Sequence, residues 1–330
     1  MAVIRLRRNS LLCGVGVAAA AVAIFAWTWH DGTGHPDFDQ LYLGAKAVRA
    51  GVSPYDAGVL PAEDGWPTRL PYPLPSILLV LPLTLLPIRI AGGVFVAATA
   101  FALGAAIAAT RNKWLFAMLA SQAFISCAGT GQWSMLFLAS VWLPFLGAFA
   151  VAKPNVGIIA AAHWQSWRPL TVAAVCGLVL VIGSFAVRSD WASEWRGALG
   201  SVPFARAPLF QRGGFLALAA LLRWRRPEAR YLLAYACIPQ TPGPYTDLML
   251  FAIPRAKWEI LALSLLSHVS LLVYNQLPTM PTLVERVMRY GEVSALLLML
   301  PCVAIVVLRP NVNEHSRLGT PVAAGQSATD

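Results

Sequence analysis

The chain has 330 residues, of which 58% are hydrophobic and only 12% are charged, and its formal net charge is +10. A soluble globular domain carries about 25% charged residues, so this composition excludes an ordinary soluble domain. It indicates a polytopic membrane protein whose Lys and Arg residues occupy short loops and set its topology. No polar domain combines basic and aromatic residues in the way that single-stranded nucleic acid requires, so we expect no nucleic-acid partner.

Several apolar runs approach the length that crosses a bilayer as a helix, for example at residues 11–27 and 90–109. The strands of a membrane barrel would alternate in polarity, and these runs do not. We therefore expect an all-α membrane bundle of nine to eleven membrane segments, forming a single domain over residues 1–312. Residues 313–330 are poor in large apolar side chains and predict a disordered cytoplasmic tail.

The first apolar run follows three arginines, Arg5, Arg7 and Arg8. A cleaved secretory signal is one interpretation, but the run is longer than a usual signal core. We prefer an uncleaved first span with a cytoplasmic N-terminus. The acid-rich stretch of about 30–73 then faces the periplasm or cell exterior, and the basic loop 223–230 is cytoplasmic.

Two apolar regions contain helix breakers. The region 74–87 is short and contains Pro75 and Pro82, which predicts a re-entrant or incomplete segment. The region 134–152 has room for one span, or for two half-helices that turn at Pro144 and Gly147.

The stretch DFDQLYLGAKAVRAG, at 37–51, predicts an amphipathic helix lying at the membrane surface. Apolar residues recur every three or four positions, Asp37 suits a helix start, and Gly51 suits a helix end. The SPYD sequence that follows predicts a turn.

Three groups of residues occur in an order that resembles glycosyltransferase family 87. The first group consists of Asp37, Phe38, Tyr42, Gly51, Pro54, Tyr55, Asp56, Tyr72, Pro73 and Pro75. The second is the pair of landmarks Gly131-Gln132 and Lys153-Pro154, and the third is PYTDL at 244–248. The interval between Gln132 and Lys153 is shorter than is usual in that family, and the whole chain is also short.

The resemblance implies a GT-C fold in the cell (inner) membrane, with the active face outside. It implies an inverting hexosyltransferase that moves mannose or a similar sugar from a polyprenyl-phosphate donor to a lipid or glycan acceptor, with no cofactor and no metal. The alternatives are a transporter or flippase of a lipid-linked sugar, and a shortened, inactive scaffold. Membrane lipids are the remaining expected partner, and the sequence does not define the sugar, the acceptor or the oligomeric state.

The resemblance places the general base at Asp37, with Asp39 as the second candidate. From the residues alone, the favoured role of Asp37 is to cap the helix, and Asp39 suits an acid that stabilises the first turn. The resemblance reverses this preference for Asp37. Lys153, flanked by apolar runs, is either a ligand of the donor phosphate or an anchor whose amine reaches the interface. The other candidates for donor and acceptor binding are Tyr42, Tyr55, Asp56, Tyr72, Gln132 and Asp247.

Overall fold

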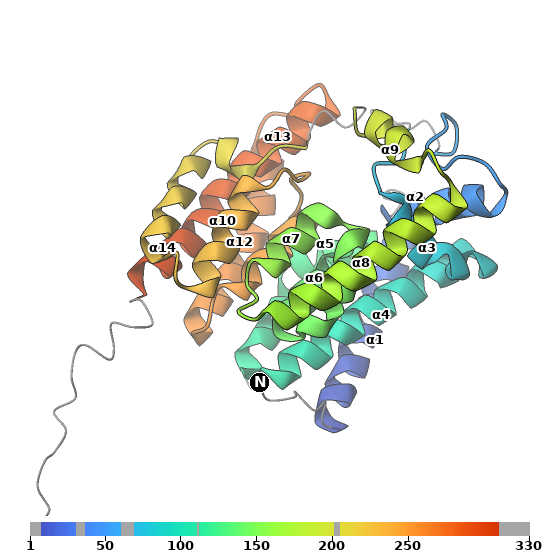
Figure 1. Cartoon of the computed structure of the whole chain (residues 1–330). Coiled ribbons are helices and arrows are strands. Elements are labelled where there is room, and N and C mark those ends of the chain that lie inside the picture. Colours follow the sequence, from blue (N-terminus) through green and yellow to red (C-terminus); the bar gives the residue numbers. More distant parts are fainter. Residues whose placement is uncertain (1–7, 31–36, 61–68, 111, 201–204, 310–330) are drawn as a thin grey trace, which may run out of the picture.

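The computed structural model describes residues 8–30, 37–60, 69–110, 112–200 and 205–309 (Figure 1). Within these ranges every regular element is a helix, and the single extended pairing is an isolated bridge between Arg206 and Gln240. The predicted all-α fold is therefore confirmed for this part of the chain. The expected tail at 313–330 lies outside the described residues.

The α-helices are α1 (Arg8–His30), α2 (Asp37–Arg49), α3 (Leu74–Val80), α4 (Ile88–Ala109), α5 (Gln122–Thr130), α6 (Ser134–Trp142), α7 (Pro154–Ala161), α8 (Trp167–Val187), α9 (Trp191–Leu199), α10 (Pro227–Cys237), α11 (Pro244–Asp247), α12 (Lys257–Gln276), α13 (Leu283–Ser294) and α14 (Leu300–Leu308). The 3₁₀ segments are η1 (Leu81–Leu85), η2 (Lys113–Ala120), η3 (Pro144–Ala152), η4 (Pro208–Phe210), η5 (Gly214–Arg223) and η6 (Leu248–Ala252). A π-helical turn, η7 (Ala295–Met299), joins α13 to α14.

Five helices in the described residues are long and apolar enough to cross a membrane: α1, α4, α8, α12 and the continuous helix Leu283–Leu308, which comprises α13, η7 and α14. Two shorter apolar helices, Leu74–Leu85 and Gly214–Arg223, accompany them. The expected nine to eleven segments are therefore not all long helices. Much of the remaining apolar sequence is divided among short pieces such as α6 and η3.

Both predicted interruptions are present. The helix that begins at Leu74 changes to 3₁₀ geometry at Leu81, immediately before Pro82. Between residues 134 and 152, α6 ends at Trp142 and η3 begins at Pro144, which gives two half-helices. The turn expected at Gly147 is wrong, because η3 continues through this residue. Proline causes such breaks because it has no backbone N–H and its ring clashes with the preceding turn.

Glycines bring α1 and α4 close together. A Cβ added to Gly104 of α4 would lie 2.7 Å from the side chain of Val17, and one added to Gly14 of α1 would lie 2.7 Å from Phe101. Small residues at such positions let membrane helices approach each other closely. The pair forms a rigid support for α2, whose Phe38 packs against Phe95 of α4.

The predicted helix at 37–51 is confirmed. It begins at Asp37 and ends at Arg49, and Gly51 follows with a φ of +74°, a left-handed conformation that favours glycine. The helix buries Phe38, Leu41 and several neighbours, so it packs onto the bundle over much of its surface.

Side chains link the segment after α2 to α9, although the two are far apart in the sequence. Ser53 donates a hydrogen bond to Glu194 Oε2 at 2.9 Å, and Arg188 binds the two oxygens of the same carboxylate at 2.6 and 2.5 Å. The indole of Trp195 donates to the Pro71 carbonyl at 2.8 Å. These contacts assemble two polar segments into one layer at one end of the bundle.

The opposite end of the bundle gathers basic loops. The carboxylate of Glu228, which is 1% exposed, forms ion pairs with Arg226, Arg255 and Arg309. Asn112 donates to the Arg255 carbonyl at 2.9 Å and so joins a further loop to this group. Loops that the positive-inside rule assigns to one side of the membrane thus lie together.

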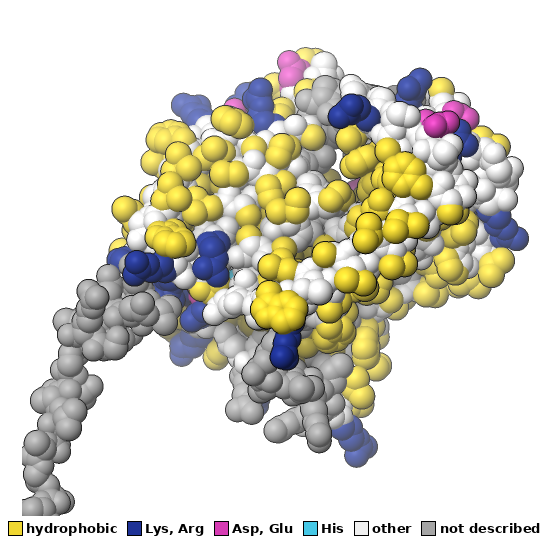
Figure 2. Space-filling model, viewed as in Figure 1, with side chains coloured by type: hydrophobic (Ala, Val, Ile, Leu, Met, Phe, Trp, Pro, Cys, Tyr) yellow, Lys and Arg dark blue, Asp and Glu magenta, His cyan; other side chains and the backbone are white. Residues whose placement is uncertain are grey.

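Helix α8 is exposed along most of its length and crosses the face seen in Figure 1. Only 11% of the most apolar 18-residue stretch of this helix is buried. Leu178, Val179 and Ile182 are all exposed. Figure 2 shows hydrophobic side chains covering this helix almost continuously. A surface of this kind is suited to hydrocarbon rather than to water.

Candidate functional site

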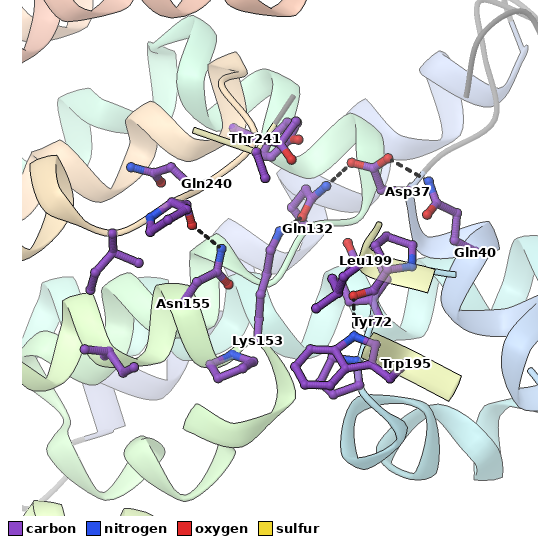
Figure 3. Close-up of a pocket in the computed structure, with 18 residues that line it drawn as sticks. Asp37, Gln40, Tyr72, Gln132, Lys153, Asn155, Trp195, Leu199, Gln240 and Thr241 are labelled. Carbon is purple, nitrogen blue, oxygen red and sulfur yellow. Dashed lines mark hydrogen bonds between the residues drawn. The ribbon is translucent and has the colours of Figure 1, made fainter. Parts of the chain in front are cut away.

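A cavity of about 720 Å³ lies between α2, the turn from α5 to α6, the start of α7, α9 and the segment 238–245 (Figure 3). Its volume lies within the range of roughly 300–1,000 Å³ typical of small-molecule sites. The polar side chains in its wall are Asp37, Gln40, Gln132, Lys153, Asn155, Gln240 and Thr241.

Asp37 occupies the first turn of α2 and is 9% exposed. Its Oδ2 accepts a hydrogen bond from Gln132 Nε2, and its Oδ1 accepts a longer one, 3.4 Å, from Gln40 Nε2. Burial raises the pKa of Asp37 to about 6, and the nearby charge of Lys153 acts in the opposite direction. The carboxylate is therefore able to take up a proton near neutral pH.

Lys153 immediately precedes α7, and its side chain extends toward Gln132 (Figure 3). Its Nζ donates to Gln132 Oε1 at 3.0 Å and lies 5.5 Å from the ring centroids of both Tyr72 and Tyr245. Burial lowers the pKa of Lys153, whereas the negative charge of Asp37 raises it. The two aromatic faces stabilise the ammonium group and hold it in the cavity wall.

Gln132 bridges the two charged groups, and the local fold explains its position. Helix α5 ends at Gly131 in a left-handed conformation, with φ of +68°, and the Gln132 N–H closes the turn by donating to the Cys127 carbonyl at 3.1 Å. A Cβ on Gly131 would lie 2.8 Å from Phe38, the residue next to Asp37. Glycine therefore permits both the turn and the close approach of α2.

The cavity wall also contains apolar side chains. They are Trp195 and Leu199 from α9, Ile158 from α7, and Ile238. Ile158 and Leu199 are 58% and 41% exposed, so the other described residues leave these two lining side chains largely uncovered.

The two other acidic residues predicted around α2 lie elsewhere. Asp39 is buried, at 4% exposure, but it is not part of the cavity wall, because the turn of the helix directs it away from Asp37. Asp56 is exposed in the turn after α2 and is also outside the wall.

Two predicted tyrosines form structural contacts outside the cavity wall. Tyr42 donates to the Leu86 carbonyl at 2.8 Å, and Tyr55 donates to the Tyr72 carbonyl at 3.2 Å. Tyr55 therefore fixes the backbone of Tyr72, which does line the cavity. Their effect on the cavity is indirect.

Asp247 is also outside the main cavity. It is 3% exposed and accepts hydrogen bonds from Tyr235 (3.2 Å), Tyr290 (2.6 Å) and Ser294 (2.5 Å). Burial raises the pKa of Asp247 to about 6, while the three hydroxyl donors lower it. The residue thus joins α10, α11 and α13, and its neighbour Tyr245 is the residue that reaches the cavity.

Four predicted residues, Asp37, Tyr72, Gln132 and Lys153, meet in one cavity wall. The cavity wall also contains four side chains that were not predicted from the sequence: Gln40, Asn155, Trp195 and Gln240. Gln40 lies one helical turn after Asp37, so the i, i+3 spacing was a usable signal. Trp195 and Gln240 come from distant segments that only the tertiary fold brings together.

Within the described part of the chain, no three His, Cys, Asp or Glu side chains gather as metal ligands. The cavity wall supplies a buried carboxylate, a buried ammonium group and several amides. Comparison of the chain with protein-family models, with curated proteins and with solved structures finds no match.

Proposed function

We propose that the protein is a membrane glycosyltransferase that moves a hexose from a polyprenyl-phosphate donor to a lipid or glycan acceptor. The observation that carries this proposal is the meeting of Asp37 and Lys153 on either side of Gln132 in one cavity of about 720 Å³. Sugar transfer from a phosphate needs a base for the incoming hydroxyl and a cation for the leaving phosphate.

The proposed step follows from these positions. The acceptor hydroxyl attacks the anomeric carbon while the bond from that carbon to the phosphate oxygen breaks. The hydroxyl proton passes to Asp37, whose Oδ1 is less tightly bound than its Oδ2. The phosphate leaves on its polyprenyl chain, and Lys153 stabilises its increased negative charge. Attack opposite the leaving group inverts the anomeric centre.

The apolar side chains of the wall support a lipid-linked donor. Ile158 and Leu199 line the cavity and are largely uncovered by other described residues, so they offer apolar contacts to the hydrocarbon chain of such a donor. Tyr72 and Trp195 offer aromatic faces on which a sugar ring can stack. A donor with a polar head and a long apolar tail matches a cavity whose wall contains both polar and apolar side chains.

The test is a transfer assay with the purified protein in vesicles, a polyprenyl-phosphate hexose and a panel of lipid acceptors, followed by mass spectrometry of the products. Asp37→Asn keeps the shape of the side chain but cannot accept the proton, and we expect turnover to fall about 100-fold or more. Asp39→Asn is the matched control, because Asp39 lies outside the cavity wall, and it should retain most of the activity.

Two results would overturn the proposal. One is full activity in Asp37→Asn together with loss of activity in Asp39→Asn, which would place the base outside the cavity. The other is movement of the lipid-linked sugar across the vesicle without a transfer product, which would identify a flippase.

A further inference from the structure

A second, much smaller hollow of about 10 Å³ lies between α10, α11, α13 and the π-helical turn η7. This volume corresponds to about one water-sized probe. Asp247, Tyr235, Ser294 and Gln240 are among the residues that line it. Gln240 also contributes to the main cavity, so the two hollows share a wall.

The charge of Asp247 lacks a compensating cation in the described structure. None of the ion pairs formed by the described residues involves Asp247, and its carboxylate is 3% exposed. Tyr235, Tyr290 and Ser294 all donate to it, which favours the ionised form of the carboxylate. A buried charge is costly without a partner of opposite sign.

A neighbouring acceptor is also unsatisfied. Gln240 is 2% exposed, and its Nε2 donates to the Tyr235 carbonyl at 3.1 Å, but its Oε1 is buried with no hydrogen-bond partner. The hydroxyl oxygens of Tyr235 and Ser294 keep lone pairs after donating to Asp247. The polar part of the wall therefore offers several oxygen acceptors, among which the ionised carboxylate of Asp247 carries a negative charge.

We propose that this hollow binds a monovalent cation, specifically sodium, between Asp247 and Gln240. Hard cations prefer oxygen ligands of this kind, and calcium sites in proteins gather more carboxylates than the single one present here. A space for one water-sized probe fits sodium better than the larger potassium ion. The site lies apart from the proposed catalytic pair and does not depend on the proposed reaction.

The position of the site gives the cation a structural effect. Asp247 ends the short helix α11, and Tyr245 of the same helix places its ring 5.5 Å from Lys153 Nζ. A bound cation fixes α11 against α10 and α13, and so fixes Tyr245 beside Lys153. Sodium would therefore stabilise the main cavity together with the fold.

The experiment measures thermal unfolding of the full chain in detergent at about pH 8, where carboxylic acids are ionised. Sodium chloride replaces choline chloride at a constant ionic strength of about 0.15 M, with potassium chloride in a parallel series. We expect a saturable rise of about 2–4 °C in the melting temperature with sodium, and a smaller rise with potassium.

Three variants test the assignment. Asp247→Asn should abolish the response to sodium, and Gln240→Met should reduce it while keeping most of the side-chain volume. Asp56→Asn removes an exposed carboxylate elsewhere and should respond like wild type. If Asp247→Asn does not fold, Gln240→Met carries the test. The same melting temperature in sodium and choline for the wild type would overturn the proposal, as would an undiminished sodium response in Gln240→Met.

Discussion

The amide group of Gln132 forms hydrogen bonds with both Asp37 and Lys153. The Nε2 of Gln132 donates to the acid and its Oε1 accepts from the amine, so each charge is stabilised without a direct ion pair. The arrangement leaves the carboxylate free of a tightly bound cation while keeping it in a positive field. The proposed base and the proposed phosphate-binding group can therefore occupy one cavity without neutralising each other.

The pH dependence of the proposed reaction follows from this pair. Burial raises the pKa of Asp37 to about 6, and Lys153 lowers it. Replacing Lys153 by Met removes the lowering effect, so the pKa of Asp37 should rise further and the acid limb of kcat/KM should move to higher pH. A pH profile of both proteins measures the shift. Lys46→Met, at an exposed position in α2, is the control, and an acid limb that stays in place in Lys153→Met would contradict the coupling.

Asp37, Gln132 and Lys153 were predicted from the resemblance to glycosyltransferase family 87, whereas residues that only tertiary contacts bring to the cavity were missed. Gln132 and Lys153 belong to the landmarks Gly131-Gln132 and Lys153-Pro154. The same pattern includes Tyr42, which lies outside the cavity wall, because a tyrosine that binds a distant carbonyl has the same sequence pattern as one that faces a ligand. Trp195 lies in the cavity wall because α9 packs against Pro71, and the sequence alone does not show this contact.

At the scale of elements, the basic end of the bundle depends on one buried acid. Glu228 lies at the start of α10 and pairs with arginines that precede α10 and α12 and follow α14. Arg309 also pairs with Glu259 in the first turn of α12. This network holds three helix ends together where apolar packing alone would allow them to separate.

Removing that acid should therefore loosen the bundle. Glu228→Gln leaves the buried guanidinium of Arg226 without this counter-charge, and we expect the free energy of unfolding to fall by about 3 kcal/mol. Arg255 is 61% exposed and Arg309 keeps its pair with Glu259, so these two arginines should contribute less to the loss. Glu292→Gln is the matched control, since the pair of Glu292 with Arg289 is 37% exposed on both sides and should contribute about 1 kcal/mol or less. Unfolding in denaturing detergent measures both, and equal losses would show that burial of Glu228 is unimportant.

Helix breaks were predictable from the sequence, but the lengths of the resulting pieces were not. Pro82 and Pro144 marked the ends of α-helical geometry because proline has no N–H to donate. Whether an apolar region crosses the membrane as one continuous helix depends on the helices that pack against it. The hydropathy of the region does not reveal these neighbours. The expected count of nine to eleven segments consequently exceeds the five long helices found in the described residues.

At the scale of the whole molecule, polar groups separate into two ends. One end holds the layer of α9 and the segment after α2, and the other holds the arginine network around Glu228. Hydropathy and the positive-inside rule predicted the all-α bundle and this grouping of loops. Which end faces the cytoplasm remains a prediction.

Cysteine labelling with a membrane-impermeant reagent tests the orientation. Val52 is 47% exposed beside the α2 layer, and Arg225 is exposed at the basic end. In a background lacking Cys13, Cys176 and Cys237, we expect Val52→Cys to react in intact cells and Arg225→Cys to react only after permeabilisation. The reverse pattern would invert the topology and place the cavity on the cytoplasmic side.

The exposure of α8 makes the shape of the cavity sensitive to bilayer thickness. The helix has 21 residues, so it is about 31 Å long, and it leads within three residues into α9, which carries Trp195 and Leu199. An apolar helix that is exposed along most of its length can respond to hydrophobic mismatch by tilting, and tilting of α8 would move the part of the cavity wall that α9 supplies. We therefore expect turnover to pass through an optimum when it is measured in vesicles of increasing acyl-chain length. Constant turnover would show that the contacts with Arg188, Ser53 and Pro71 alone fix the position of α9. On this view the surrounding lipid is a structural component of the cavity.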